Sequence, residues 1–162
     1  MSTDQAIARD EAIDPAAALE FFARRAIRGI ELVTNDAYER TIRQGRATGV
    51  VGVRLGAGGD VRLTARGDLT VTEMASCVRR MLDLDADLDA INAHLQSDEA
   101  LAPLVAARPS MRVFHGVDPF EVAIRSIIGQ QVSVSRAREL NSLLVERCGE
   151  PLPGGVAPLD RL

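Results

Sequence analysis

The chain has 162 residues, of which 46% are hydrophobic and 26% are charged, so it is large enough to fold around one core or two small ones. No apolar run reaches the length of a membrane span and no signal peptide is recognised at Met1, which argues against a membrane protein and favours the cytoplasm. The net charge of −4 argues against a nucleic-acid binder, although all 19 basic residues are arginines, the better phosphate ligands, and they cluster locally.

The first 13 residues are polar, and we expect them to form a disordered tail. A helix follows, because Asp14 is placed to cap it and Pro15 to occupy its first turn. The apolar residues of its inner stripe are Leu19, Phe22, Ala26 and Ile27. Phe21 lies off this stripe, and ordinary core packing is one role open to it.

Between residues 29 and 66 the hydrophobic period changes to two, which is typical of antiparallel strands with one buried face. The alternating apolar residues are Tyr38, Ile42, Val51, Val53, Leu55, Val61, Leu63 and Ala65. Gly45 and the run from Gly56 to Asp60 mark turns, and Ile30 to Val33 is a further candidate strand. Residues 29–66 therefore predict an antiparallel sheet.

Thr70 and Glu73 form a capping box ahead of an amphipathic helix. The residues that this helix is expected to bury are Met74, Val78, Met81 and Leu82. Shorter helices are predicted around residues 88–95 and 98–107. We therefore expect residues 14–110 to form an α+β domain, an antiparallel sheet with flanking helices.

Two further helices are predicted between Asp118 and Gly149. Asp118 and Glu121 form a capping box with a proline at the first helical position, and Glu121 can pair with Arg125 on the polar side. The expected apolar stripe of this helix is Phe120, Ala123, Ile124, Ile127 and Ile128. Ser133 can cap the second helix. Its inward residues are expected to be Val134, Ala137, Leu140, Leu144 and Cys148.

The turn between these helices reads Gly129-Gln130-Gln131, and two amides beside a glycine favour hydrogen bonding or insertion over packing. The run DPFEVAIRSIIGQQVSVSRAREL resembles the start of the helical domain in the helix-hairpin-helix DNA glycosylase superfamily, most closely its AlkA type, 3-methyladenine DNA glycosylase II. The segments ALEFFARRAIRGIE and ARPSMRVFHGVDPF extend the resemblance upstream. It implies a TATA-binding-protein-like domain over residues 14–110, and the beginning of an all-α glycosylase domain, truncated, over residues 111–162.

The resemblance also implies roles for individual residues. In this superfamily the residue at the hairpin tip fills the space left by a flipped base, which assigns that role to Gln131 and a place in the base pocket to Gln130. Ser133 and Arg136 follow as DNA-binding residues. Phe21 matches an aromatic position of the base pocket, where cation–π attraction would select cationic alkylated purines. A glutamine at the tip departs from the aliphatic residue of similar alkylation-repair enzymes and could change the damage preference.

Two parts of the family's machinery have no counterpart in the sequence. The string from Leu152 to Gly155 looks like the turn of the helix-hairpin-helix element, but Pro158 follows, so we expect a loop. No carboxylate matches the aspartate that stabilises the sugar cation, and His94 and His115 match nothing catalytic. We therefore interpret the chain as the inactive N-terminal part of a base-excision-repair enzyme. The intact protein would hydrolyse the N-glycosidic bond of alkylated purines in double-stranded DNA by a monofunctional mechanism.

No metal or cofactor is expected. Cys77 and Cys148 lack metal or redox spacing and are interpreted as reduced packing cysteines. The acidic run from Asp83 to Asp89 resembles a calcium loop, but Leu88 stands where that loop needs glycine and His94 where it needs glutamate.

Two other classes of function stay open: a helix-turn-helix regulator that reads DNA with residues 133–147, and a non-catalytic scaffold domain. The intact protein is expected to be a monomer. The two C-terminal helices carry more apolar surface than they can cover mutually. We therefore expect residues after about Val113 to be loosely held or paired with a second copy, whereas Asp14 to Ala107 forms a stable unit.

Overall fold

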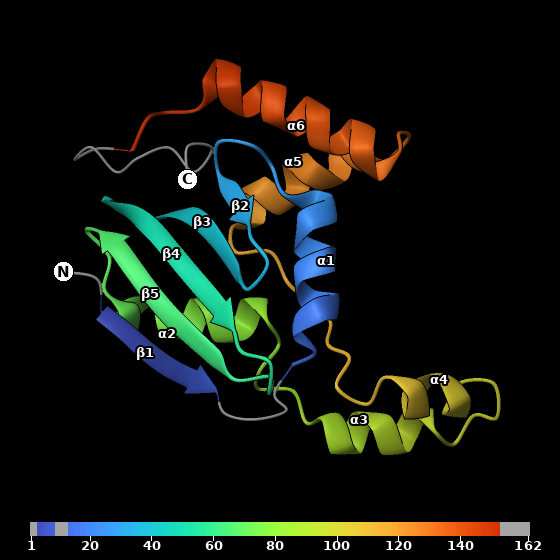
Figure 1. Ribbon diagram of the computed structural model, residues 1–162. Helices are drawn as coiled ribbons and strands as arrows, with labels where there is room; N and C mark the ends of the chain where they lie inside the picture. The colour runs from blue at the N-terminus through green and yellow to red at the C-terminus, as the bar shows by residue number, and fades with distance from the viewer. Residues whose placement is uncertain (1–2, 9–12, 153–162) are drawn as a thin grey trace.

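A computed structural model of the chain describes residues 3–8 and 13–152. Its centre is a five-stranded antiparallel sheet in the order β1-β5-β4-β3-β2 (Figure 1). The strands are β1 (Thr3–Ala8), β2 (Glu31–Val33), β3 (Ala37–Gln44), β4 (Ala47–Leu55) and β5 (Val61–Gly67). The helices are α1 (Pro15–Arg25), α2 (Val71–Met81), α3 (Leu88–Leu95), α4 (Ala102–Ala107), α5 (Pro119–Gly129) and α6 (Val134–Cys148). The α+β class predicted from the sequence is confirmed.

One face of the sheet carries the hydrophobic core. The alternating residues predicted for β3, β4 and β5 fall on this face, and Val51 and Leu63 are both 0% exposed. α1 and α2 cover it, with Phe22 of α1 and Val78 of α2 in the same buried cluster (Figure 1). The predicted antiparallel strands are confirmed, and β3 and β5 bury one face as predicted, whereas β4 is buried on both faces, with Val50 only 1% exposed.

The starts of α1 and α2 follow the predicted caps. The Asp14 side chain accepts a hydrogen bond from the Ala17 amide at 3.0 Å. Thr70 and Glu73 form both halves of the predicted capping box. α1 ends at Arg25, and Gly29, with a φ of +91°, then turns the chain into β2. These local signals set where each element begins.

The predicted disordered tail is wrong for residues 3–8, which form β1. This strand pairs along β5, and Asp4 contacts Arg62 of β5 at 3.0 Å. Ile7 packs against the core, and its carbonyl oxygen accepts a hydrogen bond of 2.7 Å from Arg79. Main-chain pairing and one apolar side chain thus hold an edge strand that carries no hydrophobic alternation.

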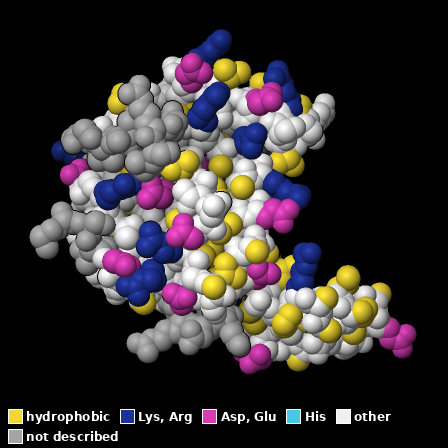
Figure 2. All heavy atoms as spheres, viewed as in Figure 1, with side chains coloured by type: hydrophobic (Ala, Val, Ile, Leu, Met, Phe, Trp, Pro, Cys, Tyr) yellow, Lys and Arg dark blue, Asp and Glu magenta, His cyan; other side chains and the backbone are white. Residues whose placement is uncertain are grey.

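α3 and α4 form an arm that projects from the sheet domain (Figures 1 and 2). Asp87, from the acidic run that fails as a calcium loop, caps α3 by accepting from the Ala90 amide at 3.0 Å. After the arm the chain returns to the sheet domain, where Phe114 packs against the core and the His115 amide donates to the Met81 carbonyl. No helix in residues 3–8 and 13–152 is long and apolar enough to cross a membrane.

α5 and α6 start at the predicted caps and form a helical hairpin beside α1 (Figure 1). Asp118 accepts from the Glu121 amide at 2.8 Å, but the Glu121 carboxylate pairs with arginines, so only this half of the predicted capping box is formed. The predicted loop from Leu152 to Gly155 lies outside the described residues, except for Leu152. The end of the predicted segment 111–162 lies outside them as well.

The predicted inward faces of α5 and α6 are wrong in large part. Phe120 and Ile127 of α5 are 74% and 64% exposed, and Val134 of α6 is 51% exposed. Of the eleven described residues of α5 none is buried, and in α6 only Asn141 and Ser142 are. In α5, Glu121 and Arg125 take the side that faces the sheet, so Phe120 and Ile127 are left in solvent while Ile124 and Ile128 are half-buried. This exposure agrees with the expectation that the hairpin cannot cover its own apolar surface.

Candidate functional site

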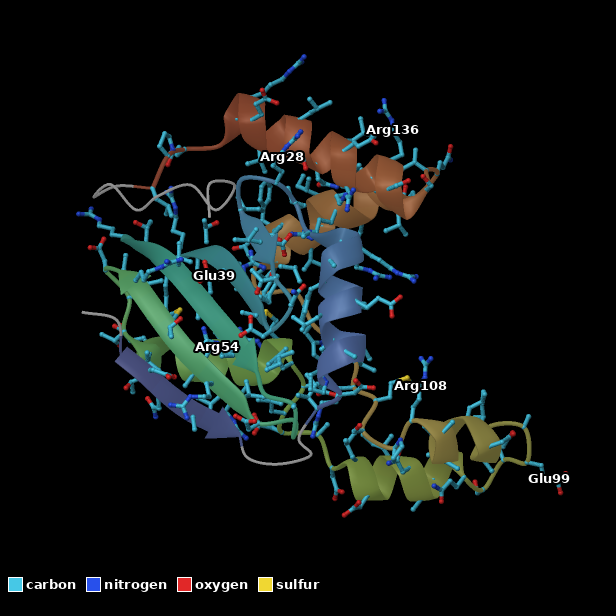
Figure 3. All side chains as sticks on the ribbon, in the orientation of Figure 1. Arg28, Glu39, Arg54, Glu99, Arg108 and Arg136 are labelled. Atoms are coloured by element: carbon cyan, nitrogen blue, oxygen red, sulfur yellow. The ribbon has the colours of Figure 1, made fainter. Side chains whose placement is uncertain are left out.

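The turn between α5 and α6 carries the four residues that the sequence assigned to DNA binding. Gln130 is the first residue after α5, and Gln131 comes next in the turn. Both side chains are exposed. Ser133 caps α6 by accepting from the Arg136 amide at 3.3 Å, and Arg136 pairs with Glu139 at 2.9 Å. Figure 3 shows Arg136 projecting outward from α6. The four residues share one solvent-facing corner of the molecule, and their role toward DNA stays a prediction.

Phe21 lies in a cluster of aromatic rings at the other end of α5. Its ring centroid is 5.0 Å from that of Phe114 and 5.5 Å from that of Phe22, and Phe22 stacks on Tyr38 at 4.4 Å. These separations lie in the range that favours aromatic pairs. Three separate segments, α1, β3 and the return segment before α5, therefore converge on one aromatic site.

A cavity of about 390 Å³ opens beside these rings, between α1, the sheet and α5. Its aromatic lining is Phe21, Phe22, Tyr38 and Phe114, and its charged lining includes Arg25, Glu31, Arg40, Glu121 and Arg125. Gln130, the second residue predicted for the base pocket, is not among the described residues that line this cavity. The structure thus places Phe21 at a cavity and Gln130 at the exposed turn.

Arg25 covers part of the aromatic cluster. Its guanidinium carbon lies 4.0 Å from the centroid of the Phe21 ring, a cation–π geometry, and the same group donates to the Phe21 carbonyl oxygen at 3.3 Å. The Phe21 ring therefore already holds a cation in this structure.

A buried group of charges lies next to the rings. The side chains of Glu31 on β2 and Arg40 on β3 are each only 6% exposed. Their charged atoms lie 3.8 Å apart. Arg40 makes its shortest ion pair, 2.7 Å, with Glu121 of α5. The sheet and α5 therefore meet through ionised groups that are largely withdrawn from water.

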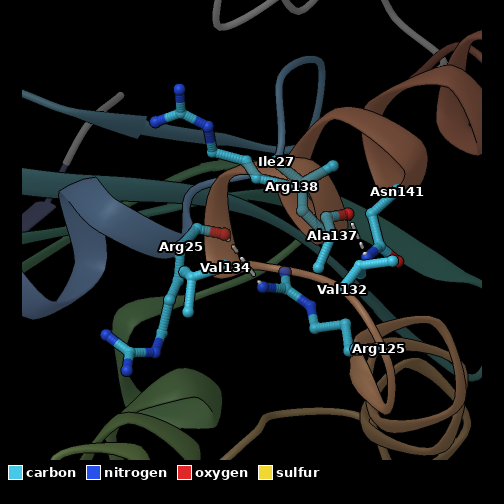
Figure 4. A pocket seen from close by; sticks show the side chains of 9 residues that line it. Arg25, Ile27, Arg125, Val132, Val134, Ala137, Arg138 and Asn141 are labelled. Atoms are coloured by element: carbon cyan, nitrogen blue, oxygen red, sulfur yellow. Dashed lines mark hydrogen bonds between the residues drawn. The ribbon is translucent and has the colours of Figure 1, made fainter.

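Arg125 completes this group from α5. One of its guanidinium nitrogens lies 2.6 Å from a Glu31 oxygen and 2.6 Å from a Glu121 oxygen. The other terminal nitrogen donates to the Arg25 carbonyl oxygen at 3.3 Å (Figure 4). Two carboxylates and two guanidinium groups face one another here, so their formal charges cancel. Such pairing is the condition under which charges are tolerated in an interior.

The site shifts two proton equilibria. Burial raises the pKa of Tyr38, whose hydroxyl donates to Glu31 at 2.6 Å. Burial acts to lower the pKa of Arg40, but its interactions with Tyr38, Glu121 and Glu31 outweigh that effect and raise the pKa overall. Both side chains therefore keep their protons at all ordinary pH values, and the cluster keeps its hydrogen bonds.

The hairpin also caps the carbonyl end of α1. Besides the bond from Arg125, Arg138 of α6 donates to the Ala23 carbonyl oxygen at 3.4 Å. A second cavity of about 210 Å³ lies at this junction (Figure 4). Cations at the C-terminal end of a helix complement its partial negative charge. Arginines thus tie the base of the hairpin to the end of α1, beside an apolar contact in which Ile27 is buried and lines the same cavity as Val134 and Ala137.

The sequence analysis missed Arg40 and Glu31. Arg40 lies midway between Tyr38 and Ile42 in a period-two pattern, so that pattern already put it on the buried face. A buried arginine needs carboxylate partners, so a search for acids that could pair with Arg40 would have included Glu31 and Glu121. What the sequence could not show is that α5 turns its polar side toward the sheet.

Other candidate groups are scattered. Among the described residues, no three His, Cys, Asp or Glu side chains are placed to hold one metal ion. Cys77 and Cys148 are free thiols. His115 lies 3.7 Å from Asp83, with its side chain half exposed.

The chain is similar in sequence to proteins of known family. Residues 9–118 match the family model described as the AlkA N-terminal domain. The chain is 36% identical over 132 residues to the Mycobacterium tuberculosis protein named "Probable bifunctional transcriptional activator/DNA repair enzyme AlkA". The matched residues cover 80% of this chain and 26% of that protein. It is 32% identical over 137 residues to DNA-3-methyladenine glycosylase 2 of Escherichia coli, with 83% of this chain and 46% of that protein covered.

Among solved structures, 3-methyladenine DNA-glycosylase from Archaeoglobus fulgidus shares the fold, with a TM-score of 0.75 and 17% identity over 96% of this chain and 53% of that one. The chain spans 26% and 46% of the lengths of the two curated relatives, so it corresponds to only part of either protein. The resemblance read from the sequence to the AlkA type is confirmed. With a family match that covers more than half of its residues, the chain belongs to the AlkA N-terminal domain family.

Proposed function

We propose that this chain is the N-terminal part of a DNA repair glycosylase that removes alkylated purines from double-stranded DNA. One observation carries the proposal: the AlkA-family sheet domain continues directly into a helical hairpin that presents Gln130 and Gln131 to solvent. In this assignment residues 14–110 form the α+β domain and residues 111–162 begin the helical domain.

The exposed turn is the proposed contact with the DNA stack. An enzyme that acts on a base inside a duplex must rotate the nucleotide out and keep the gap open. Gln131, exposed in the turn, is the proposed gap-filling residue, with Gln130 beside it toward the flipped base. Ser133 and Arg136 lie on the α6 side of the turn, where a hydroxyl and an unburied guanidinium can bind phosphate.

The aromatic cavity is the proposed wall of the base pocket on the sheet-domain side. Alkylated purines such as 3-methyladenine carry positive charge, and the face of an aromatic ring attracts cations. Phe21 meets this requirement, because its ring lines the cavity and already attracts the guanidinium of Arg25. Gln130 lies away from this wall, so its proposed approach to the base is from the opposite side.

The carboxylate that stabilises the sugar cation is proposed to come from outside these 162 residues. Two acids line the aromatic cavity, Glu31 and Glu121, and each is engaged by guanidinium groups at 2.6 or 2.7 Å. A carboxylate held this way cannot turn toward a substrate without leaving buried arginines unpaired. The proposed reaction is monofunctional hydrolysis of the N-glycosidic bond and uses no metal.

The test is a base-release assay on duplex DNA that contains 7-methylguanine. We expect the purified 162-residue chain to release no 7-methylguanine above background. A longer product of the same gene, extended beyond residue 162, is expected to release this base. Activity of the short chain that is lost on Glu121→Gln would refute the assignment of the acid to another segment. A longer product that binds the duplex without releasing any base would favour the regulator or scaffold alternatives.

A further inference from the structure

Apolar packing explains the position of α5 on the sheet domain only in part. Two of its large apolar side chains, Phe120 and Ile127, are 74% and 64% exposed, Ile124 and Ile128 are only half-buried, and none of its eleven residues is fully buried. The side of α5 that faces the sheet carries Glu121 and Arg125, whose side chains are 23% and 25% exposed. The partial burial of two isoleucines does not by itself fix where this helix lies, because the hydrophobic effect is non-directional.

The buried charges supply a directional alternative. Glu121 binds Arg40 on β3 at 2.7 Å, and Arg125 binds Glu31 on β2 at 2.6 Å, so each charged residue of α5 has an oppositely charged partner on the sheet. The cross-pair between Glu121 and Arg125, also 2.6 Å, holds the two α5 side chains in one geometry. A guanidinium group bonds in fixed directions, in contrast to an apolar contact, which tolerates sliding.

Small displacements of α5 would break these pairs. A shift by one residue rotates the helix by about 100° and turns both side chains away, and a shift by one turn moves them by about 5.4 Å. Either displacement would leave Arg40 and Glu31, with side chains only 6% exposed, without their α5 partners. The cost of an unpaired buried charge therefore penalises every register but the observed one.

We propose that Glu31, Arg40, Glu121 and Arg125 form a charge joint that fixes the register and tilt of α5 on the sheet domain. The joint lies at the aromatic cavity, and the exposed turn begins at the far end of the same helix. It thereby positions Gln130 and Gln131 relative to Phe21. The geometric part of this proposal is independent of the proposed function, and only its consequence for DNA binding rests on that function.

The test is a spin-label distance measurement between α5 and the sheet in the 162-residue chain. Labels are attached at Ile127→Cys and Arg54→Cys, two exposed positions, in a background with Cys77→Ser and Cys148→Ser. The unaltered joint should give one narrow distance distribution. A broad distribution in this parent protein would overturn the proposal before any joint residue is changed.

The decisive variant is Arg40→Met with Glu121→Met, which removes one pair and keeps the pair of Glu31 with Arg125. Replacing both members of an ion pair by apolar residues leaves stability nearly unchanged, so the circular dichroism melting curve should resemble that of the parent. The distance distribution should become at least about twice as wide. A parent-like width in this folded variant would overturn the proposal.

Two further variants keep the result interpretable. The matched control, Arg136→Met with Glu139→Met, removes an exposed ion pair of α6 and should leave the width unchanged; broadening there would also contradict the proposal. Glu121→Gln, nearly isosteric, should broaden the distribution in the same direction by a smaller factor. If the double variant does not fold, a parent-like width for Glu121→Gln is the result that refutes the joint.

Discussion

The sheet domain and the α5–α6 hairpin are held by opposite kinds of contact. In the sheet domain, apolar side chains such as Val51, Leu63 and Val78 are fully buried between strands and helices. In the hairpin, Phe120 and Ile127 face solvent, and ion pairs and hydrogen bonds make much of the contact with the rest of the chain.

The difference shows that an apolar stripe predicts a helix better than it predicts what the helix packs against. The apolar stripe of α5 follows helical periodicity, although less strongly than that of α2, yet only α2 turns its whole stripe toward the core. An exposed apolar face of this kind marks a surface that is suited to further contact. In the proposed enzyme the remaining helices of the glycosylase domain would cover it.

The largest expected difference between the two regions is in the cost of removing an apolar side chain. Leu63→Ala, in the sheet domain, should lower the free energy of unfolding by about 2–5 kcal/mol, because it leaves a cavity in a close-packed core. Ile127→Ala, on the exposed face of α5, should change it by no more than about 0.5 kcal/mol. Urea unfolding followed by circular dichroism measures both, and equal costs would contradict the distinction.

The same distinction explains which features the sequence could predict. The strands β3, β4 and β5 and the caps at Asp14, Thr70 and Ser133 are local signals, and each was found where it was predicted. β1 was missed because main-chain pairing with β5, and not hydrophobic alternation, defines it.

The site was only partly predictable for a related reason. The resemblance identified Phe21 and the residues of the turn, and the structure places Phe21 at the aromatic cavity. The charge joint depends on residues that are about 80 to 95 positions apart, as the separations of 81 for Arg40 with Glu121 and 94 for Glu31 with Arg125 show. Periodicity within one helix cannot report such a pairing, because it does not say which element will lie opposite.

A smaller effect is expected at the turn, and it concerns binding instead of folding. In a gene product that includes the remaining domain, Gln131→Ala should weaken binding to a duplex with an abasic-site analogue by about tenfold, because unstacking costs a few kcal/mol. Binding to the corresponding single strand should change little, since no stack must be held open. Fluorescence anisotropy with both DNAs measures this.

The matched control is Gln96→Ala, which removes an exposed glutamine on the projecting arm and should leave both affinities unchanged. Equal losses on duplex and single strand for Gln131→Ala would argue that this residue only contacts the backbone. That result would leave the comparison of the two regions intact but remove the gap-filling role of the turn.

The most direct test of the central claim is amide hydrogen exchange on the 162-residue chain. The claim is that an apolar core stabilises the sheet domain, whereas a few polar contacts hold α5 and α6 to it. It predicts slow exchange in β3, β4 and β5, and much faster exchange in α5 and α6, together with binding of a hydrophobic dye. Uniformly slow exchange across both regions in a monomer that binds no such dye would contradict it.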